Sequence, residues 1–270
     1  MQTSSPFCSI LYIPHGGGPL PILGHEGHTD MVAFLKTIPE RLGQPDAVLV
    51  ISAHWEEKIP TLTAHASPPL FYDYYGFPPE TYEIQYPAPG SPKLAEKIFQ
   101  LLGTQGIKAN LDKKRGFDHG MFIPLVFMYP DAKIPCVQLS LTADLDPSAH
   151  LVLGRALSGL KNKNILILGS GFSFHNMRAF GDTLPDRKNI EFDQWLIHTC
   201  TDRNLSPEQR EERLIQWEKA PHARYCHPRE EHLLPLHVCA GMAGKPAEVV
   251  FNKEVLNKRA TAFLWQENQS

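Results

Sequence analysis

In Ile10-Leu11-Tyr12-Ile13-Pro14-His15-Gly16-Gly17-Gly18-Pro19, near the start of the chain, a short apolar run ends in a histidine and three glycines. Consecutive apolar residues of this kind are typical of a strand buried on both faces. The glycines let the backbone turn sharply after the strand and leave room beside the imidazole. The same order recurs at Ala47-Val48-Leu49-Val50-Ile51-Ser52-Ala53-His54, which predicts a second strand that ends in a histidine.

These two histidines predict a metal site. Open α/β sheets bind their ligands at the carboxyl ends of the strands, so His15 and His54 are expected to face one site. Imidazole suits iron, zinc, copper or nickel, whereas magnesium and calcium prefer oxygen ligands. Glu56, two residues beyond His54, offers a carboxylate that could hydrogen-bond a ligating histidine.

Strand-like and helix-like stretches alternate along the whole chain. Strands are expected at 9–13, 47–52, 60–64, 107–111, 134–139, 164–169, 247–251 and 260–265, and helices at 28–42, 91–102, 147–160, 188–203, 206–219 and 231–243. This alternation predicts an α/β fold with a central, mostly parallel or mixed sheet flanked by helices. No repeat or linker divides the chain, so we expect a single domain over 1–270.

Composition excludes several classes of partner. The 270 residues include 26 Lys and Arg against 29 Asp and Glu, and this net charge of −3 gives no field suited to nucleic acid or an anionic membrane. No apolar run approaches the roughly 18 residues of a membrane-spanning helix. The five cysteines are scattered and never spaced as CxxC, which indicates reduced thiols in a cytoplasmic protein. We expect a monomer or a homodimer.

Residues 66–92, called here the aromatic segment, fit no regular element. They hold seven prolines and the run Phe71-Tyr72-Asp73-Tyr74-Tyr75-Gly76-Phe77. Long irregular loops in compact domains are usually lids or binding loops. One interpretation is a surface loop held by its own rings. The other is an aromatic wall over a flat substrate, for which Tyr72, Tyr75 and Phe77 are the candidates.

Three further histidines stand in suggestive contexts. His175 follows the predicted strand 164–169 within Gly169-Ser170-Gly171-Phe172-Ser173-Phe174-His175-Asn176, which favours a general acid/base or ligand role over a structural one. His119 lies in Asp118-His119-Gly120. This stretch predicts either a tightly turned functional site or an ordinary turn with no special role for the histidine. His232 follows Glu230 and Glu231 near a predicted helix start, and any of these three could complete a metal site.

Six segments, in this order and over nearly the whole chain, resemble one family. They are His15-Gly16-Gly17-Gly18-Pro19, Ser52-Ala53-His54-Trp55-Glu56, Tyr72-Asp73-Tyr74-Tyr75-Gly76-Phe77-Pro78, Asp118-His119-Gly120, Gly169 to Asn176, and Glu231-His232-Leu233-Leu234-Pro235-Leu236. Together the segments resemble those of class III extradiol ring-cleaving dioxygenases of the LigB type, in the DOPA 4,5-dioxygenase-like subgroup.

The resemblance implies one non-haem metal and a catecholic substrate, such as DOPA, that reacts with O₂. His15, His54 and His232 match metal ligands, although the last is a glutamate in protocatechuate-cleaving relatives. Fe(II) is expected in the active enzyme, and zinc is a possible occupant because it outcompetes Fe²⁺ at most nitrogen sites. His175 matches the catalytic histidine, and His119 matches a histidine near the substrate oxygens.

Two other functions remain open from the sequence. A zinc hydrolase would use three histidines and a bound water, with Glu56 or Glu231 as base, but no HExxH motif supports it. A non-enzymatic metal-binding protein of the Memo type would share the fold. For a substrate carboxylate, the sequence offers Arg115 or Arg178 as the cation.

Overall fold

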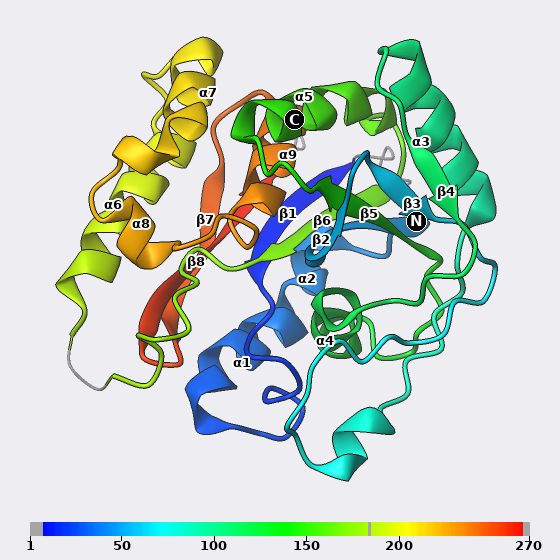
Figure 1. Cartoon of the computed structure of the whole chain (residues 1–270), viewed down its shortest axis with the longest axis horizontal. Coiled ribbons are helices and arrows are strands. Elements are labelled where there is room, and N and C mark those ends of the chain that lie inside the picture. The colour runs from blue at the N-terminus through cyan, green and yellow to red at the C-terminus, as the bar shows by residue number, and fades with distance from the viewer. Residues whose placement is uncertain (1–7, 183–184, 267–270) are drawn as a thin grey trace.

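The computed structural model describes residues 8–182 and 185–266, and its strands form one eight-stranded sheet (Figure 1). The order across the sheet is β4-β3-β5-β2-β6-β1-β8-β7. The strands are β1 (Ser9–Pro14), β2 (Ala47–Glu57), β3 (Thr61–Thr63), β4 (Asn110–Asp112), β5 (Cys136–Thr142), β6 (Ile165–Gly171), β7 (Glu248–Val255) and β8 (Lys258–Trp265).

The sheet is mixed, as the sequence predicts. Its central strands β5, β2, β6 and β1 are parallel, whereas β8 runs antiparallel to β1 and β3 runs antiparallel to β5. β7 and β8 form a hairpin whose turn residues, Leu256 and Asn257, both have positive φ. Such a turn matches the twist of the flanking strands.

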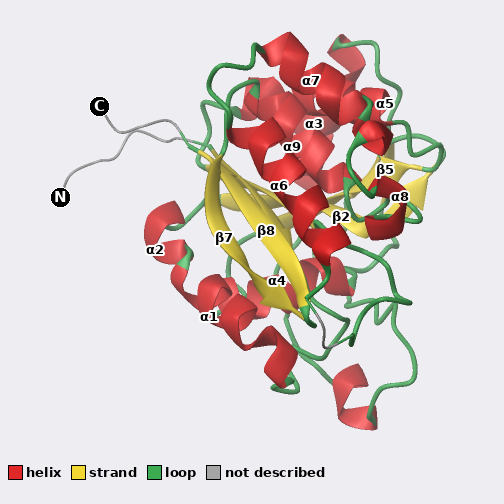
Figure 2. Cartoon of the chain, turned by 90° about the vertical axis from the view of Figure 1, so that its left-hand side faces the viewer, coloured by secondary structure: helices red, strands yellow, loops and turns green. Residues whose placement is uncertain are grey.

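Helices cover both faces of the sheet. They are α1 (Thr29–Thr37), α2 (Pro39–Leu42), α3 (Pro92–Thr104), α4 (His119–Met128), α5 (Pro147–Ala156), α6 (Arg187–Thr201), α7 (Pro207–Ile215), α8 (Ala223–Cys226) and α9 (Leu234–Ala243). The helices α3, α5 and α9 lie on one side, and α1 and α4 lie on the other (Figure 1). Figure 2 shows the β7–β8 hairpin between α1 and α6, at one end of the sheet.

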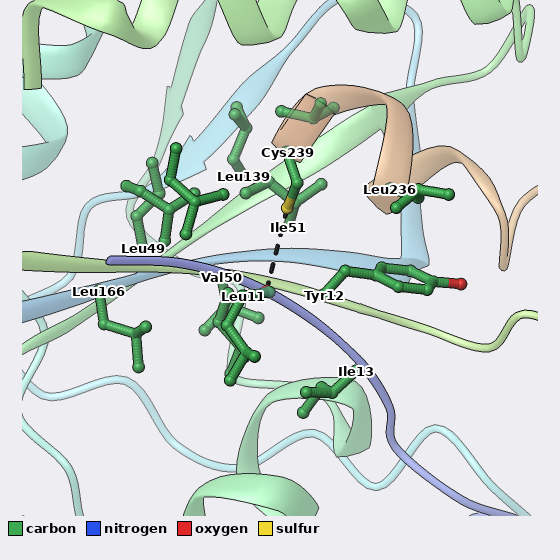
Figure 3. Close-up of a cluster of buried hydrophobic side chains, with 14 of the residues drawn as sticks. Leu11, Tyr12, Ile13, Leu49, Val50, Ile51, Leu139, Leu166, Leu236 and Cys239 are labelled. Carbon is green, nitrogen blue, oxygen red and sulfur yellow. Dashed lines mark hydrogen bonds between the residues drawn. The ribbon is translucent and has the colours of Figure 1, made fainter. Parts of the chain in front are cut away.

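The core alternates between these two layers. In β2, Leu49 and Ile51 point toward α9, and Val50 points to the opposite face (Figure 3). The thiol of Cys239 on α9 reaches the carbonyl oxygen of Leu11 in β1 at 3.9 Å. These side chains are buried, as the unbroken apolar runs of the strands require.

The helices predicted at 91–102, 147–160 and 206–219 are present, and each begins at a Ser-Pro or Asp-Pro pair. Ser91 accepts a hydrogen bond from the N–H of Leu94 at the start of α3, and Asp146 caps α5 in the same way. Ser206 and Gln209 form a reciprocal capping box on α7. The stretch predicted as one helix at 28–42 is divided at Ile38, because Pro39 begins a separate turn.

The helix α4 is absent from the predicted elements. It is apolar on all sides, buried, and contains Pro124, so it lacks the periodicity that marks an amphipathic helix. β2 is also longer than the predicted 47–52, and its register against β5 shifts between Ile51 and Glu56. His54 therefore lies in the irregular stretch of a strand that continues past it.

The aromatic segment has little regular structure, in agreement with the sequence. It contains one 3₁₀ turn, η2 (Pro79–Tyr82), and isolated bridges tie Leu70 to Phe117 and Gly90 to Cys136. All five cysteines are buried free thiols. Among the described residues, every helix is too short or too polar to cross a bilayer.

Candidate metal centre and active site

Three histidines from three distant parts of the chain meet at one point. His15 follows β1, His54 lies in β2, and His232 lies just before α9. The Nε2 atoms of His15 and His54 are 2.9 Å apart, and those of His54 and His232 are 3.3 Å apart. Two nitrogens on one tetrahedral metal ion lie about 3.4 Å apart for bonds of about 2.05 Å. The spacing of this histidine triad therefore fits a single ion.

His15 is held by the neighbouring strand β6. Its Nδ1 lies 3.1 Å from the hydroxyl of Ser170, which itself donates a hydrogen bond to the carbonyl oxygen of Gly120. Because that hydroxyl has used its only proton, it accepts the Nδ1–H of His15. The Nε2 atom of His15 is then unprotonated and free to bind a cation.

The turn after His15 depends on Gly16. This residue has a φ of +87°, and a Cβ there would lie 2.8 Å from Pro21 and 2.9 Å from the ring of His28. The ring of His28 accepts a hydrogen bond from the N–H of Gly17 at 3.0 Å. Only glycine fits this backbone conformation in so crowded a place.

Glu231 joins His232 to His175. One carboxylate oxygen of Glu231 lies 2.9 Å from Nδ1 of His232 and 3.0 Å from Nδ1 of His175. Burial opposes ionisation of Glu231, but the hydrogen bonds from His175 and His232 outweigh it and lower the pKa of this carboxyl. An ionised carboxylate only accepts, so both Nδ1 atoms carry protons and both Nε2 atoms are free.

A second carboxylate, that of Asp73, faces another pair of histidines. It lies 2.8 Å from Nδ1 of His119 and 3.6 Å from Nδ1 of His54. Burial would raise the pKa of Asp73, but its hydrogen bonds with His119 outweigh this effect and lower the pKa. The rings of His54 and His119 are packed with their centroids 3.9 Å apart.

The triad is suited to a cation. Burial, followed by repulsion from the neighbouring histidines, lowers the pKa of His15 and of His54 well below 6.5. Burial likewise lowers the pKa of His232 to about 3. The triad is therefore neutral at physiological pH, with unprotonated nitrogens turned toward one another. Buried acceptors need a donor or a cation, and one metal ion satisfies all three.

The chemistry of this centre agrees with comparisons to known proteins. A family described as the catalytic LigB subunit of aromatic ring-opening dioxygenase matches residues 11–263. The chain belongs to the LigB family. This family is dependent on a non-haem metal, and the histidine triad is one of three overlapping groups in the described residues that could bind it, the one made of histidines alone.

Relatives of this LigB-family chain are dioxygenases by name. The dioxygenase tasH of Hapsidospora irregularis is 39% identical over 95% of this chain and 85% of its own length. The 4,5-DOPA dioxygenase extradiol of Beta vulgaris is 39% identical over 89% of this chain and 90% of its own. The crystal structure of an uncharacterized Escherichia coli K12 protein has a TM-score of 0.76 and 28% identity, covering 95% of this chain and 98% of that one.

An open cavity of about 320 Å³ adjoins the triad of the LigB-family chain. It is lined by Ala53, His54, Glu56, Arg229, Glu231 and His232. Glu56 pairs with both terminal nitrogens of Arg229, at 2.5 and 2.6 Å, and its carboxylate is therefore committed to an arginine. The interpretation of Glu56 as a partner of His54 is not supported by this pairing, and Asp73 faces His54 instead.

The three candidate rings of the aromatic segment lie in different places. Tyr75 is 91% exposed. The hydroxyl of Tyr72 donates to the carbonyl oxygen of Ile84, and Phe77 packs near Gly18. Tyr74, which was not among the predicted substrate contacts, is the ring of this segment that packs against His119, with centroids 5.7 Å apart. Substrate contacts of Tyr72, Tyr75 and Phe77 stay predictions.

The two arginines singled out in the sequence differ in setting. Arg115 is stacked between Trp55 and Phe71 and pairs with the buried carboxylate of Asp118 at 3.2 Å. Arg178 is exposed. The cation that lines the cavity is Arg229, which was not among the predicted cations because nothing in its local sequence marks it.

Proposed function

We propose that this LigB-family chain is an extradiol dioxygenase, with one catalytic domain, that inserts both atoms of O₂ into a catechol such as DOPA. His15, His54 and His232 would hold a non-haem iron. The observation that carries the proposal is the convergence of three unprotonated Nε2 atoms beside two further imidazoles, each of which is hydrogen-bonded to a carboxylate. Three relatives from plants bear the name 4,5-DOPA dioxygenase extradiol, which supports DOPA as the first substrate to try.

Iron is the proposed native metal, and zinc is a possible occupant. A ferrous ion held by these three histidines would act as a Lewis acid that eases loss of the catechol protons, and it would supply the redox chemistry for reaction with O₂. Three neutral imidazoles leave that site one unit more positive than two imidazoles and a carboxylate. Such a set also matches a three-histidine zinc site, so the metal has to be identified by experiment.

His175 is the proposed base. Its Nδ1–H is held by Glu231, so its Nε2 is free to take a proton from a catechol hydroxyl. The same carboxylate then stabilises the imidazolium that forms, because the charge pair lies in a half-buried site. His119, held in the same manner by Asp73, is proposed to hydrogen-bond a substrate oxygen.

Oxygen consumption tests the proposal. Metal-free protein is reloaded without air with Fe(II) or with Zn(II) and mixed with DOPA and a small set of catechols. We expect the iron form to consume O₂ in step with a yellow ring-opened product, and the zinc form to consume none. No uptake with any catechol, despite one iron per chain, would overturn the proposal in favour of a zinc hydrolase or a non-enzymatic metal-binding protein.

A further inference from the structure

Asp73 makes the contacts that tie the aromatic segment to the metal centre. Its side chain is 11% exposed, and its Oδ1 lies 2.8 Å from Nδ1 of His119 and accepts the backbone N–H of the same residue at 3.0 Å. Its Oδ2 faces Nδ1 of His54 at 3.6 Å. One carboxylate thus meets two imidazoles that are far from it in the sequence.

The double contact with His119 replaces a local helix cap. α4 begins at His119, and the residue in the capping position, Asp118, makes no side-chain cap. The carboxylate of Asp118 is instead bonded to the hydroxyl of Ser52 at 2.8 Å and to Arg115 at 3.2 Å. The first N–H of the helix therefore finds its acceptor in Asp73, 46 residues earlier. Backbone and ring of His119 are fixed by the same oxygen.

The residues around Asp73 hold it in place. On one side, the hydroxyl of Tyr72 donates to the carbonyl oxygen of Ile84, and on the other, the hydroxyl of Tyr74 donates to that of Thr81. The aromatic segment is thus closed on itself by its own tyrosines, with the aspartate directed inward. The segment thus places a carboxylate at the metal centre. Neither interpretation from the sequence, a surface loop or an aromatic wall over the substrate, includes this role.

We propose that Asp73 is a positioning residue that holds His119 in the Nδ1–H tautomer. This inference rests on the proposed function for the role of His119. Asp73 is the counterpart of Glu231, because each carboxylate bridges one histidine of the triad and one histidine beside it. Partners of this kind fix the tautomer and the direction of ligand and acid/base imidazoles.

The first test reads the tautomer directly and needs no turnover. Zinc-loaded protein labelled with ¹⁵N-histidine is studied by NMR, and the signals of His119 are assigned by their loss in His119→Gln. We expect the Nδ1–H pattern in the wild type and its loss in Asp73→Ala. Glu83→Gln, which removes an exposed acidic group from the same segment, should keep the pattern. An unchanged pattern in Asp73→Ala would overturn the inference.

The second test measures whether Asp73 acts through His119. In iron-loaded protein of verified iron content, Asp73→Ala should lower kcat about 10- to 100-fold and change KM much less. The same substitution in a His119→Gln background should have almost no further effect on kcat. Equal losses in both backgrounds would mean that Asp73 supports the fold alone, which would contradict the inference.

Two safeguards keep the tests decisive. If Asp73→Ala does not fold, Asp73→Asn takes its place. The asparagine side chain has the same size as that of aspartate, and its amide oxygen is a weaker hydrogen-bond acceptor than the carboxylate. The variant's smaller loss of kcat must again vanish in the His119→Gln background. If the wild type consumes no O₂ with any catechol, the proposed function fails, and the NMR result still decides whether Asp73 positions His119.

Discussion

The rings of His175 and His232 are stacked, with centroids 3.4 Å apart and an angle of 18° between their planes. Both rings hydrogen-bond the same oxygen of Glu231, so one carboxylate sets the orientation of both. In the proposed function one ring binds metal and the other takes a proton. Stacked on a member of the triad, the proposed base would lie next to a substrate bound at the metal.

Replacing the proposed base should separate chemistry from metal binding. We expect His175→Ala to lower kcat by about 100- to 10,000-fold while leaving most of the metal in place. His15→Ala should instead lose the metal. Oxygen uptake and elemental analysis of the same samples provide the measurement, with the exposed His65→Gln as control. Loss of metal from His175→Ala would make His175 a ligand.

The carboxylate shared by the stacked rings should tune metal affinity. Glu231→Gln removes the charge that holds the Nδ1–H of His232, so we expect the metal to bind about 10- to 100-fold more weakly. Competition with a chelator measures this change. Glu230→Gln is the matched control, because Glu230 pairs with Arg224 away from the triad and should change affinity by no more than about fivefold. Equal effects of the two substitutions would contradict the assignment.

The metal-free protein should begin to lose stability at pH values well above those at which carboxylates titrate. Burial lowers the pKa of His28 to about 4, of His227 to about 3 and of His237 to about 4. Below the unfolded value of 6.5, the unfolded chain takes up protons that the folded chain cannot, so the free energy of unfolding falls as pH falls. Each such histidine contributes about 1.4 kcal/mol per pH unit.

Urea unfolding between pH 7 and pH 5 measures that slope. The histidines of the triad add to it in the metal-free protein, because their pKa values are also lowered. His227→Gln should remove the contribution of one proton from the slope, whatever its effect on stability at pH 7. A stability that does not change from pH 7 to pH 5 would contradict the burial of these histidines.

The glycine turn beside His15 should resist substitution more than a comparable glycine elsewhere. Gly16→Ala forces an L-residue to a φ of +87° and places its Cβ 2.8 Å from Pro21. Gly24→Ala is matched in backbone, with a φ of +73°, but has open space. We expect Gly24→Ala to cost about 1 kcal/mol of unfolding free energy and Gly16→Ala clearly more. Thermal and urea unfolding measure both variants. Equal losses of unfolding free energy would contradict the prediction, because they would mean that Pro21 and His28 move aside for the new Cβ.

Much of the fold could be predicted because its signals are local. Apolar runs such as 47–52 mark buried strands, and Ser206-Pro207 marks a helix start, since each depends on neighbours in the chain. α4 could not be predicted, because its apolar surface is explained only by the layers that bury it. The order of the strands in the sheet could not be predicted either, because strand pairing joins segments that are far apart in the sequence.

Two apolar runs in the sequence predicted strands that each end in a histidine, His15 and His54, and indicated a metal site there, although the structure extends β2 past His54 to Glu57. Which histidine nitrogens face the triad depends on contacts that form when the chain folds. Ser170, Glu231 and Asp73 set the protonated nitrogens of their histidine partners, and each of them is remote in the chain from at least one of those partners. A tautomer depends on a hydrogen bond to a particular atom, and the folded chain alone brings that atom within about 3 Å.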